Sequence, residues 1–232
     1  HRIWLSPESY PESYYPDTTP VKYEITEHGA IFTPEAEIQN GVQKQLEIKM
    51  DPDDANMQVI MRVKNITEAP KEFSIWGLTV SAQDGTVIVP MNDNDTGLLH
   101  NRNISVWPYT DLSDSRLYFG NHYVTLHQDR TNQQLFKLGF NLNDAEVYYC
   151  VGEDIFRKAF ETNHPIEKYP DGGCSFEMFT NSSFVEIESL NPLTTVRAEE
   201  TVSLTEHWSI LKKPCEVDFK NDSSIDNMFD KL

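Results

Sequence analysis

Residues 174–192 read CSFEMFTNSSFVEIESLNP and predict two β-strands joined by a short polar turn. Because strand side chains alternate between two faces, Glu186 and Glu188 share one face. Val185 and Ile187 share the other face. Two carboxylates at successive same-face positions repel each other unless solvent, a cation or a bound polar ligand faces them. The pair therefore marks either an ordinary solvated sheet face or a polar site.

Short β-rich segments, separated by glycine, proline or asparagine, fill most of the remaining chain. In MQVIMRVKN (57–65), methionine and valine occupy alternate positions. The ITEAPK turn leads into EFSIWGLTV (72–80), and the two segments predict an antiparallel hairpin. Other strands are expected at 21–27, 30–34, 45–50, 86–90, 122–128, 135–140, 146–152, 155–161 and 201–213, with a short one within 103–116. So many strands with little helix predict an all-β fold, a large sandwich or barrel.

The two ends of the chain differ from this pattern. Residues 1–20 are rich in proline and aromatic residues, so they predict an ordered loop that walls a cleft rather than a helix or a central strand. Residues 221–232 form a C-terminal tail with a short helix, capped by Ser223 or Ser224. Because neither a repeat nor a linker interrupts the chain, the sequence predicts a single domain over residues 1–232.

The composition limits the classes of partner. The 232 residues carry a net charge of −18, since 37 acidic residues outnumber 19 basic ones. This charge argues against nucleic acid and against an anionic membrane surface. Hydrophobic residues make up 38% of the chain, enough for a core, but none of the apolar runs reaches membrane-spanning length. Neutral or cationic ligands are therefore favoured.

The cysteines and acidic motifs give no sign of a metal or cofactor. Cys150, Cys174 and Cys215 lack metal-ligand spacing, and reduced thiols are favoured, with one disulfide plus a free thiol left open. Residues 51–54 lack the glycine and terminal glutamate of an EF-hand loop, and Walker, GxSxG and HExxH motifs are absent. The cytoplasm is the favoured location. A secreted or periplasmic protein stays open because the sequence begins at His1 without an initiator methionine.

Several longer motifs follow one another along the chain: HRIWLSPES (1–9), VIMRVKNITEAPKEFSIWGLTV (59–80) with VIVP (87–90), WPYTDLSDSR (107–116), KYPDGGCSFEMFT (168–180), FVEIESLNPL (184–193) and LTEHWSIL (204–211). In order and spacing they resemble the galactose mutarotase-like superfamily, which includes the aldose 1-epimerases, and within it a bacterial group. The resemblance implies a large antiparallel β-supersandwich whose N-terminal strands would precede His1. It also implies a sugar or small carbohydrate as the partner.

The resemblance further implies roles for particular residues. Aldose 1-epimerases use a late glutamate as base and a histidine as acid, because the reaction needs a carboxylate and a group of near-neutral pKa. Glu188 matches the late glutamate, and Glu186 could bind a hydroxyl or raise the pKa of its neighbour. Trp76 stands where these enzymes carry a histidine, and its ring can stack on a sugar but cannot transfer a proton. Other histidines, more often structural on a strand, lie away from family positions: His100, His122, His127, His164 and His207.

Five further residues are candidates for the sugar site. Arg2 and Trp4 resemble the arginine and aromatic residue that line the sugar cleft in relatives, with an ordinary packed strand end as the alternative. Trp107 and Tyr109 form either an aromatic platform, as carbohydrate sites use, or a plug against the core. Glu206 either joins the carboxylates or occupies a salt-bridged or solvated position.

Three functions remain open on the sequence. The first is a mutarotase-like protein that binds a carbohydrate in the cleft of a concave sheet without epimerase chemistry, favoured by Trp76 at the expected histidine. The second is an aldose epimerase or related sugar-active enzyme, with Glu188 as general base and an unidentified acid. The third is a structural β-sandwich module of a larger protein.

Overall fold

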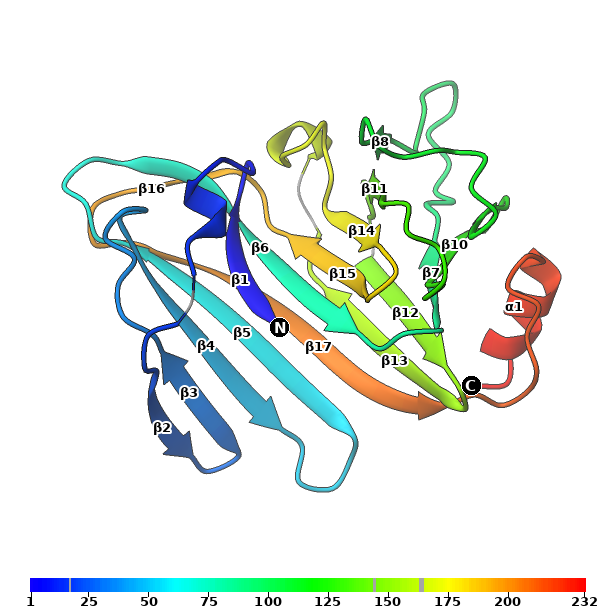
Figure 1. The fold of residues 1–232 in the computed structure, drawn as a ribbon, viewed down its shortest axis with the longest axis horizontal. Coiled ribbons are helices and arrows are strands. Elements are labelled where there is room, and N and C mark those ends of the chain that lie inside the picture. The colour runs from blue at the N-terminus through cyan, green and yellow to red at the C-terminus, as the bar shows by residue number, and fades with distance from the viewer. Residues whose placement is uncertain (17, 144, 163–164) are drawn as a thin grey trace.

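The chain forms two antiparallel β-sheets stacked face to face (Figure 1). The computed structural model describes residues 1–16, 18–143, 145–162 and 165–232. Within these residues, the smaller sheet has seven strands and the larger sheet has ten. This arrangement confirms the expected all-β sandwich.

The smaller sheet contains β1 (Arg2–Ser6), β6 (Lys71–Ser81), β8 (Ile104–Val106), β11 (Phe136–Phe140), β14 (Phe176–Thr180), β15 (Val185–Leu190) and β16 (Thr194–Val196). Its order is β1-β6-β15-β14-β11-β8, and β16 also pairs with β6. The predicted hairpin of residues 174–192 is confirmed as β14 and β15, which pair in antiparallel register.

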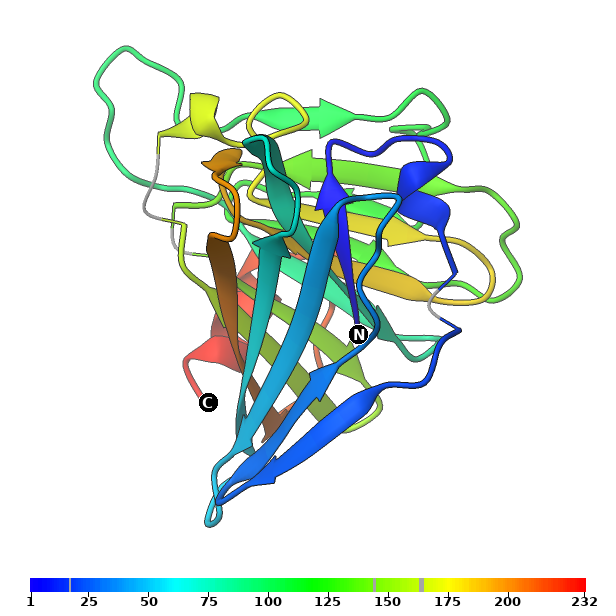
Figure 2. The same ribbon diagram turned by 90° about the vertical axis from the view of Figure 1, so that its left-hand side faces the viewer.

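The larger sheet contains β2 (Lys22–Thr26), β3 (Gly29–Thr33), β4 (Val42–Met50), β5 (Asn56–Asn65), β7 (Thr86–Pro90), β9 (Leu117–Phe119), β10 (Tyr123–His127), β12 (Ala145–Val151), β13 (Asp154–Phe160) and β17 (Thr201–Lys212). Its order is β2-β3-β4-β5-β17-β13-β12-β7-β10-β9. Strands β2 and β3 lie at its far edge and extend away from the smaller sheet (Figures 1 and 2).

The hydrophobic core lies between the sheets. Each strand contributes the alternate side chains of its inner face, such as Phe136, Leu138 and Phe140 of β11, and all three are fully buried. Val87 and Val89 of β7 pack into the same core from the larger sheet. Because side chains alternate with a period of two, one face of each strand is apolar and packs into the core.

The expected hairpin of residues 57–65 with 72–80 is wrong. Strand β5 pairs with β4 and β17 in the larger sheet, whereas β6 pairs with β1, β15 and β16 in the smaller one. The intervening turn carries the chain between the sheets, and the buried Asn65 amide fixes it by donating to the carbonyls of Ala69 and Val196. With β5 and β6 in stacked sheets, the apolar faces of both strands pack against each other and are buried. Pairing them side by side in one hairpin would not bury these faces against each other.

The N-terminal segment is only partly the expected loop. Arg2–Ser6 form β1, an edge strand paired with β6, and the loop with its short 3₁₀ turn η1 (Glu12–Tyr14) follows. Prolines exclude a central strand, but Arg2–Ser6 contains none, so the edge position is available to it.

The C-terminal tail contains helix α1 (Asp222–Phe229), as expected. Its N-cap is Asn221, whose side chain accepts a hydrogen bond from the Ser224 amide, rather than either serine. Ile225 and Met228 pack against the outer face of the larger sheet. A further 3₁₀ turn, η2, covers Ile166–Lys168. The helices among the described residues are too short to span a bilayer.

Candidate functional site

The β14–β15 hairpin presents its acidic side chains on the outer face of the smaller sheet, away from the core. The register places Glu186 beside Phe179 and Glu188 beside Glu177. The alternate side chains of β15 are fully buried between the sheets. Glu186 and Glu188 therefore share one face, as alternation predicts.

A buried lysine forms the floor of this face. The Lys137 ammonium lies 2.7 Å from Glu177 Oε2 and 2.9 Å from Glu188 Oε2. Trp76 Nε1 donates to the same Glu188 oxygen at 2.6 Å. The ammonium also lies 4.5 Å from the Trp76 ring and 4.8 Å from the Trp107 ring, within cation–π range. We call Lys137, Glu177, Glu188 and Trp76 the buried floor, because each is at most 4% exposed.

Burial and neighbouring charges shift the pKa values of Lys137 and Glu177 in the buried floor. Burial alone would lower the pKa of Lys137, but Glu188 and Glu177 together raise that pKa above its ordinary value. Burial and the Glu188 carboxylate raise the pKa of Glu177 well above its usual range, and Lys137 opposes this shift. Among the described residues, the Oε1 atoms of Glu177 and Glu188 are buried without a hydrogen-bond partner.

Glu186 is the carboxyl that titrates near neutral pH. It is partly exposed, and burial followed by the Glu188 charge raises its pKa to about 7. Arg2 and Lys137 oppose this shift. From the sequence, Glu186 is expected to bind a hydroxyl or to raise the pKa of its neighbour, whereas the raised pKa described here is that of Glu186 itself. Of the two residues, Glu186 is the more accessible, since Glu188 is fully buried.

Several aromatic rings lie on the same side of the smaller sheet as Glu186, and Phe179 is its partner in the strand register. Tyr109 is 43% exposed, and its ring lies 6.5 Å from that of Phe179, edge to face. Burial raises the pKa of Tyr109 to about 12, so the phenol stays neutral. From the N-terminal segment, Trp4 contacts the ring of Trp76 at 5.4 Å and the ring of Tyr14 at 5.2 Å.

The structure brings most of the sequence candidates together. The outer face of the smaller sheet and its flanking loops carry Arg2, Trp4, Trp76, Trp107, Tyr109, Glu186 and Glu188. The Arg2 guanidinium lies over the Trp4 ring at 5.2 Å. These residues form a mixed aromatic and charged surface, which we call the outer-face site.

Glu206 does not join the outer-face site. It lies on β17 of the larger sheet and points into the space between the sheets, where it is fully buried. Lys158 Nζ lies 3.0 Å from its Oε1, Trp208 Nε1 donates to its Oε2 at 2.7 Å, and Ser189 Oγ donates to Oε1. The salt-bridged alternative is therefore confirmed, because burial requires the charge to be paired.

Sequence reasoning missed Lys137, Glu177 and Phe179. The signal for Lys137 is a lysine in the middle of the apolar segment LFKLGF. Glu177 and Phe179 occupy alternate positions of the first strand of the hairpin, so its register would have placed them beside the two candidate glutamates.

The histidines that form described contacts do so away from the outer-face site. His1 Nδ1 lies 3.0 Å from Thr79 Oγ1 between the sheets. His127 contacts Thr86, and His122 lies 3.6 Å from Asp226 beside α1. His164 lies outside the described residues. Within the described ranges, groups of three or more potential metal-ligating side chains were not found.

Comparison with known proteins supports the fold and leaves the activity undefined. Neither a family model nor a curated protein matches the sequence. The Slr1438 protein from Synechocystis sp. PCC 6803 superimposes with a TM-score of 0.51 at 10% identity, over 82% of this chain and 65% of that chain. A candidate aldose 1-epimerase from Klebsiella pneumoniae gives the same TM-score and identity, over 82% of this chain and 53% of that chain.

A third structure places a similar sandwich within a longer protein. A TPR-domain containing protein from Parabacteroides distasonis has a TM-score of 0.54 at 13% identity, over 92% of this chain and 38% of that chain. This chain thus spans between about two fifths and two thirds of the three proteins. The fold is that of the galactose mutarotase-like β-sandwiches, as the sequence motifs imply.

Proposed function

We propose that this protein binds a neutral sugar at the outer-face site and does not interconvert its anomers. The observation that carries this proposal is Glu186, a partly exposed carboxyl beside Phe179, whose ring in turn contacts that of Tyr109. Aromatic rings stack on the C–H faces of a sugar while a carboxylate accepts hydrogen bonds from its hydroxyls.

The buried floor supports binding over catalysis. Glu188, which matches the family base, is fully buried, and one of its oxygens accepts hydrogen bonds from both Trp76 and Lys137. A base must reach the proton that it removes. The floor instead fixes the sheet surface beneath a ligand. The acidic side chains around it favour a neutral sugar over a phosphorylated one.

The test is a panel of neutral monosaccharides and sugar phosphates, scored by melting temperature and by isothermal titration calorimetry. A ligand that binds the native protein raises its melting temperature by mass action. We expect Tyr109→Ala and Glu186→Gln to weaken sugar binding at least tenfold. Tyr23→Ala is the matched control, because Tyr23 is an exposed tyrosine on β2, far from the site in the fold. Absence of any shift across the panel would contradict sugar binding.

Glu186 also favours a second candidate, a sugar-active enzyme. A carboxyl with a pKa of about 7 is matched to general acid–base chemistry at neutral pH. NMR measurement of anomer interconversion separates the two functions. A catalyst that uses Glu186 loses activity in Glu186→Gln, whereas one that uses Glu188, as the family resemblance implies, loses it in Glu188→Gln. A binding protein shows no enzyme-dependent interconversion in either form.

A structural module of a larger protein is the remaining alternative. The coverage of only 38% of the Parabacteroides distasonis protein is compatible with such a role. A module of this kind would show no sugar-induced change in melting temperature.

A further inference from the structure

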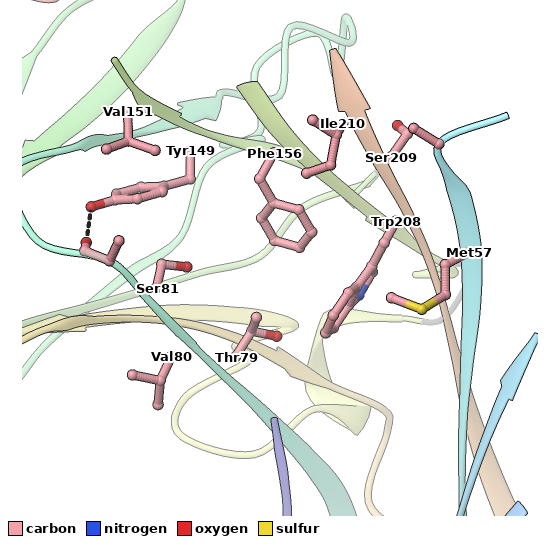
Figure 3. Close-up of a pocket in the computed structure, with 12 residues that line it drawn as sticks. Met57, Thr79, Val80, Ser81, Tyr149, Val151, Phe156, Trp208, Ser209 and Ile210 are labelled. Carbon is pink, nitrogen blue, oxygen red and sulfur yellow. Dashed lines mark hydrogen bonds between the residues drawn. The ribbon is translucent and has the colours of Figure 1, made fainter. Parts of the chain in front are cut away.

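A cavity of about 350 Å³ lies between the two sheets, at the end of the sandwich where β6 finishes (Figure 3). Thr79 and Ser81 line it from the inner side of β6, and Val80 is the one lining residue from the face of β6 that carries the outer-face site. Trp208, Phe156 and Tyr149 line it from the larger sheet. It belongs to no function described above.

The sequence of β6 explains the cavity. Along its inner face the side chains become smaller, from Phe73 and Ile75 to Gly77, Thr79 and Ser81. Packed sheets lie about 10 Å apart, a distance that only large side chains can fill. The core is therefore dense at the start of β6 and hollow at its end.

The walls favour a flat apolar ligand. The rings of Phe156 and Trp208 meet edge to face, with centroids 5.1 Å apart and an interplanar angle of 87°. Figure 3 shows both rings directed into the space opposite Thr79. Met57 and Ile210 add aliphatic surface at the sides. Aromatic ligands pack well against such perpendicular rings because both a face and an edge are available.

The walls also exclude charge. The described residues that line the cavity are all uncharged. The ion pair behind the wall is already satisfied, since Lys158 Nζ contacts Glu206 Oε1 at 3.0 Å and Thr79 Oγ1 at 2.9 Å. A charged ligand would lose its hydration here without gaining a counter-ion.

We propose that this inter-sheet cavity binds an uncharged aromatic molecule of one to three rings. Its volume of about 350 Å³ is more than twice that of an engineered apolar cavity of about 150 Å³ that holds one benzene. Ligand pockets in proteins begin at about 300 Å³. The site is independent of the sugar proposal, and either can hold when the other fails.

The test uses the intact protein with N-phenyl-1-naphthylamine, indole, cyclohexanol and 1-naphthalenesulfonate as probes. We expect the two uncharged aromatic probes to bind at least tenfold more tightly than the sulfonate or the alcohol. Trp208 fluorescence should be quenched on binding. In Trp208→Phe the quenching should disappear while the fluorescence enhancement of N-phenyl-1-naphthylamine persists. Equal binding of the sulfonate, or quenching that survives in Trp208→Phe, would overturn the proposal.

Filling the cavity gives an independent check. Ser81→Leu should weaken N-phenyl-1-naphthylamine binding at least tenfold, because the new side chain occupies the space. Ala82→Leu at the rim should also weaken binding of this probe, and it replaces Ser81→Leu if that variant does not fold. Ser203→Leu is the control, since Ser203 is exposed on β17 and does not line this cavity. Unchanged binding in a folded Ser81→Leu or Ala82→Leu protein would overturn the assignment.

Discussion

At the scale of single residues, the outer-face site depends on one buried lysine. Lys137 neutralises carboxylates from two neighbouring strands, and its ammonium is held between two indole rings. Burying an ion pair costs desolvation energy. Removing only one partner is strongly destabilising, because the other charge then stays buried without compensation. The arrangement keeps Glu186 as the carboxyl that faces outward.

Lys137→Met tests this role. We expect it to lower the free energy of unfolding by about 3–5 kcal/mol, because the glutamates beneath Glu186 lose their only buried cation among the described contacts. Adding Glu188→Gln should recover part of the loss. Lys64→Met is the matched control, since its pair with Glu199 is exposed and worth at most about 1 kcal/mol. Urea denaturation measures all of these, and equal losses for the two lysines would contradict the prediction.

Glu186 should titrate far above an ordinary glutamate. Its pKa is raised from 4.5 to about 7, so the folded protein binds this proton more tightly than the unfolded chain. Its contribution to stability is therefore full below pH 4.5 and is lost as the pH rises through 7. Carboxyl-carbon NMR should show the midpoint, and Glu188→Gln should lower it by removing a neighbouring charge. A midpoint near 4.5 in the native protein would refute the assignment.

Alternation predicted which glutamates share a face, since period two needs only local sequence. It could not predict the raised pKa of Glu186, because that shift depends first on burial, which the whole fold sets. Lys137, which opposes the shift, lies about fifty residues away along the chain and two strands away in the sheet. The choice between the two roles of Glu206 stayed open for a related reason. Alternation indicates the strand face on which Glu206 lies, but its buried partner Lys158 comes from another strand and cannot be inferred from the local sequence.

At the scale of elements, helix α1 is held on the larger sheet by its first residue. The Asp222 carboxylate accepts hydrogen bonds from the backbone amides of Asn121 at 2.7 Å and His122 at 3.0 Å. Gly120 is required beside it, because an added Cβ would lie 2.1 Å from Asp222 Oδ1. The sequence predicted the helix but not its cap, since asparagine and serine are comparably good N-caps.

Asp222→Ala should loosen this docking. We expect a loss of about 1–3 kcal/mol, because two amides lose their acceptor. Hydrogen exchange should accelerate in residues 222–229. Asp230→Ala, at the exposed end of the helix, controls for the removal of charge. Equal exchange in the two variants would argue against a docking role.

At the scale of the whole molecule, polar contacts connect the two sheets within an otherwise apolar core. Lys158 of the larger sheet donates to the Ile187 carbonyl and the Thr79 hydroxyl of the smaller sheet, both at 2.9 Å. Sequence patterns gave the strands and their faces. They could not assign strands to sheets, and so the expected pairing of residues 57–65 with 72–80 failed, because alternation does not identify the neighbour of a strand.

Gly77 provides the room for this connection. A Cβ there would lie 2.8 Å from both Glu206 Oε1 and Ser189 Oγ. Since Lys158 and Trp208 hold Glu206 in place, Gly77→Ala should push the sheets apart and destabilise the fold by about 1–3 kcal/mol. Thermal unfolding checks this, and a change below about 0.5 kcal/mol would show that the space is freely adjustable.

The three free thiols differ in burial, so their rates of alkylation can report local opening of the fold. Cys174 is buried near the turn that precedes β14, and Cys150 is buried beneath α1, and burial raises the pKa of each to about 12. Cys215 is more accessible. An alkylating reagent should therefore modify Cys215 first. Faster modification of Cys150 in Asp222→Ala, with the rate at Cys174 unchanged, would show that α1 detaches locally while the region around Cys174 stays folded.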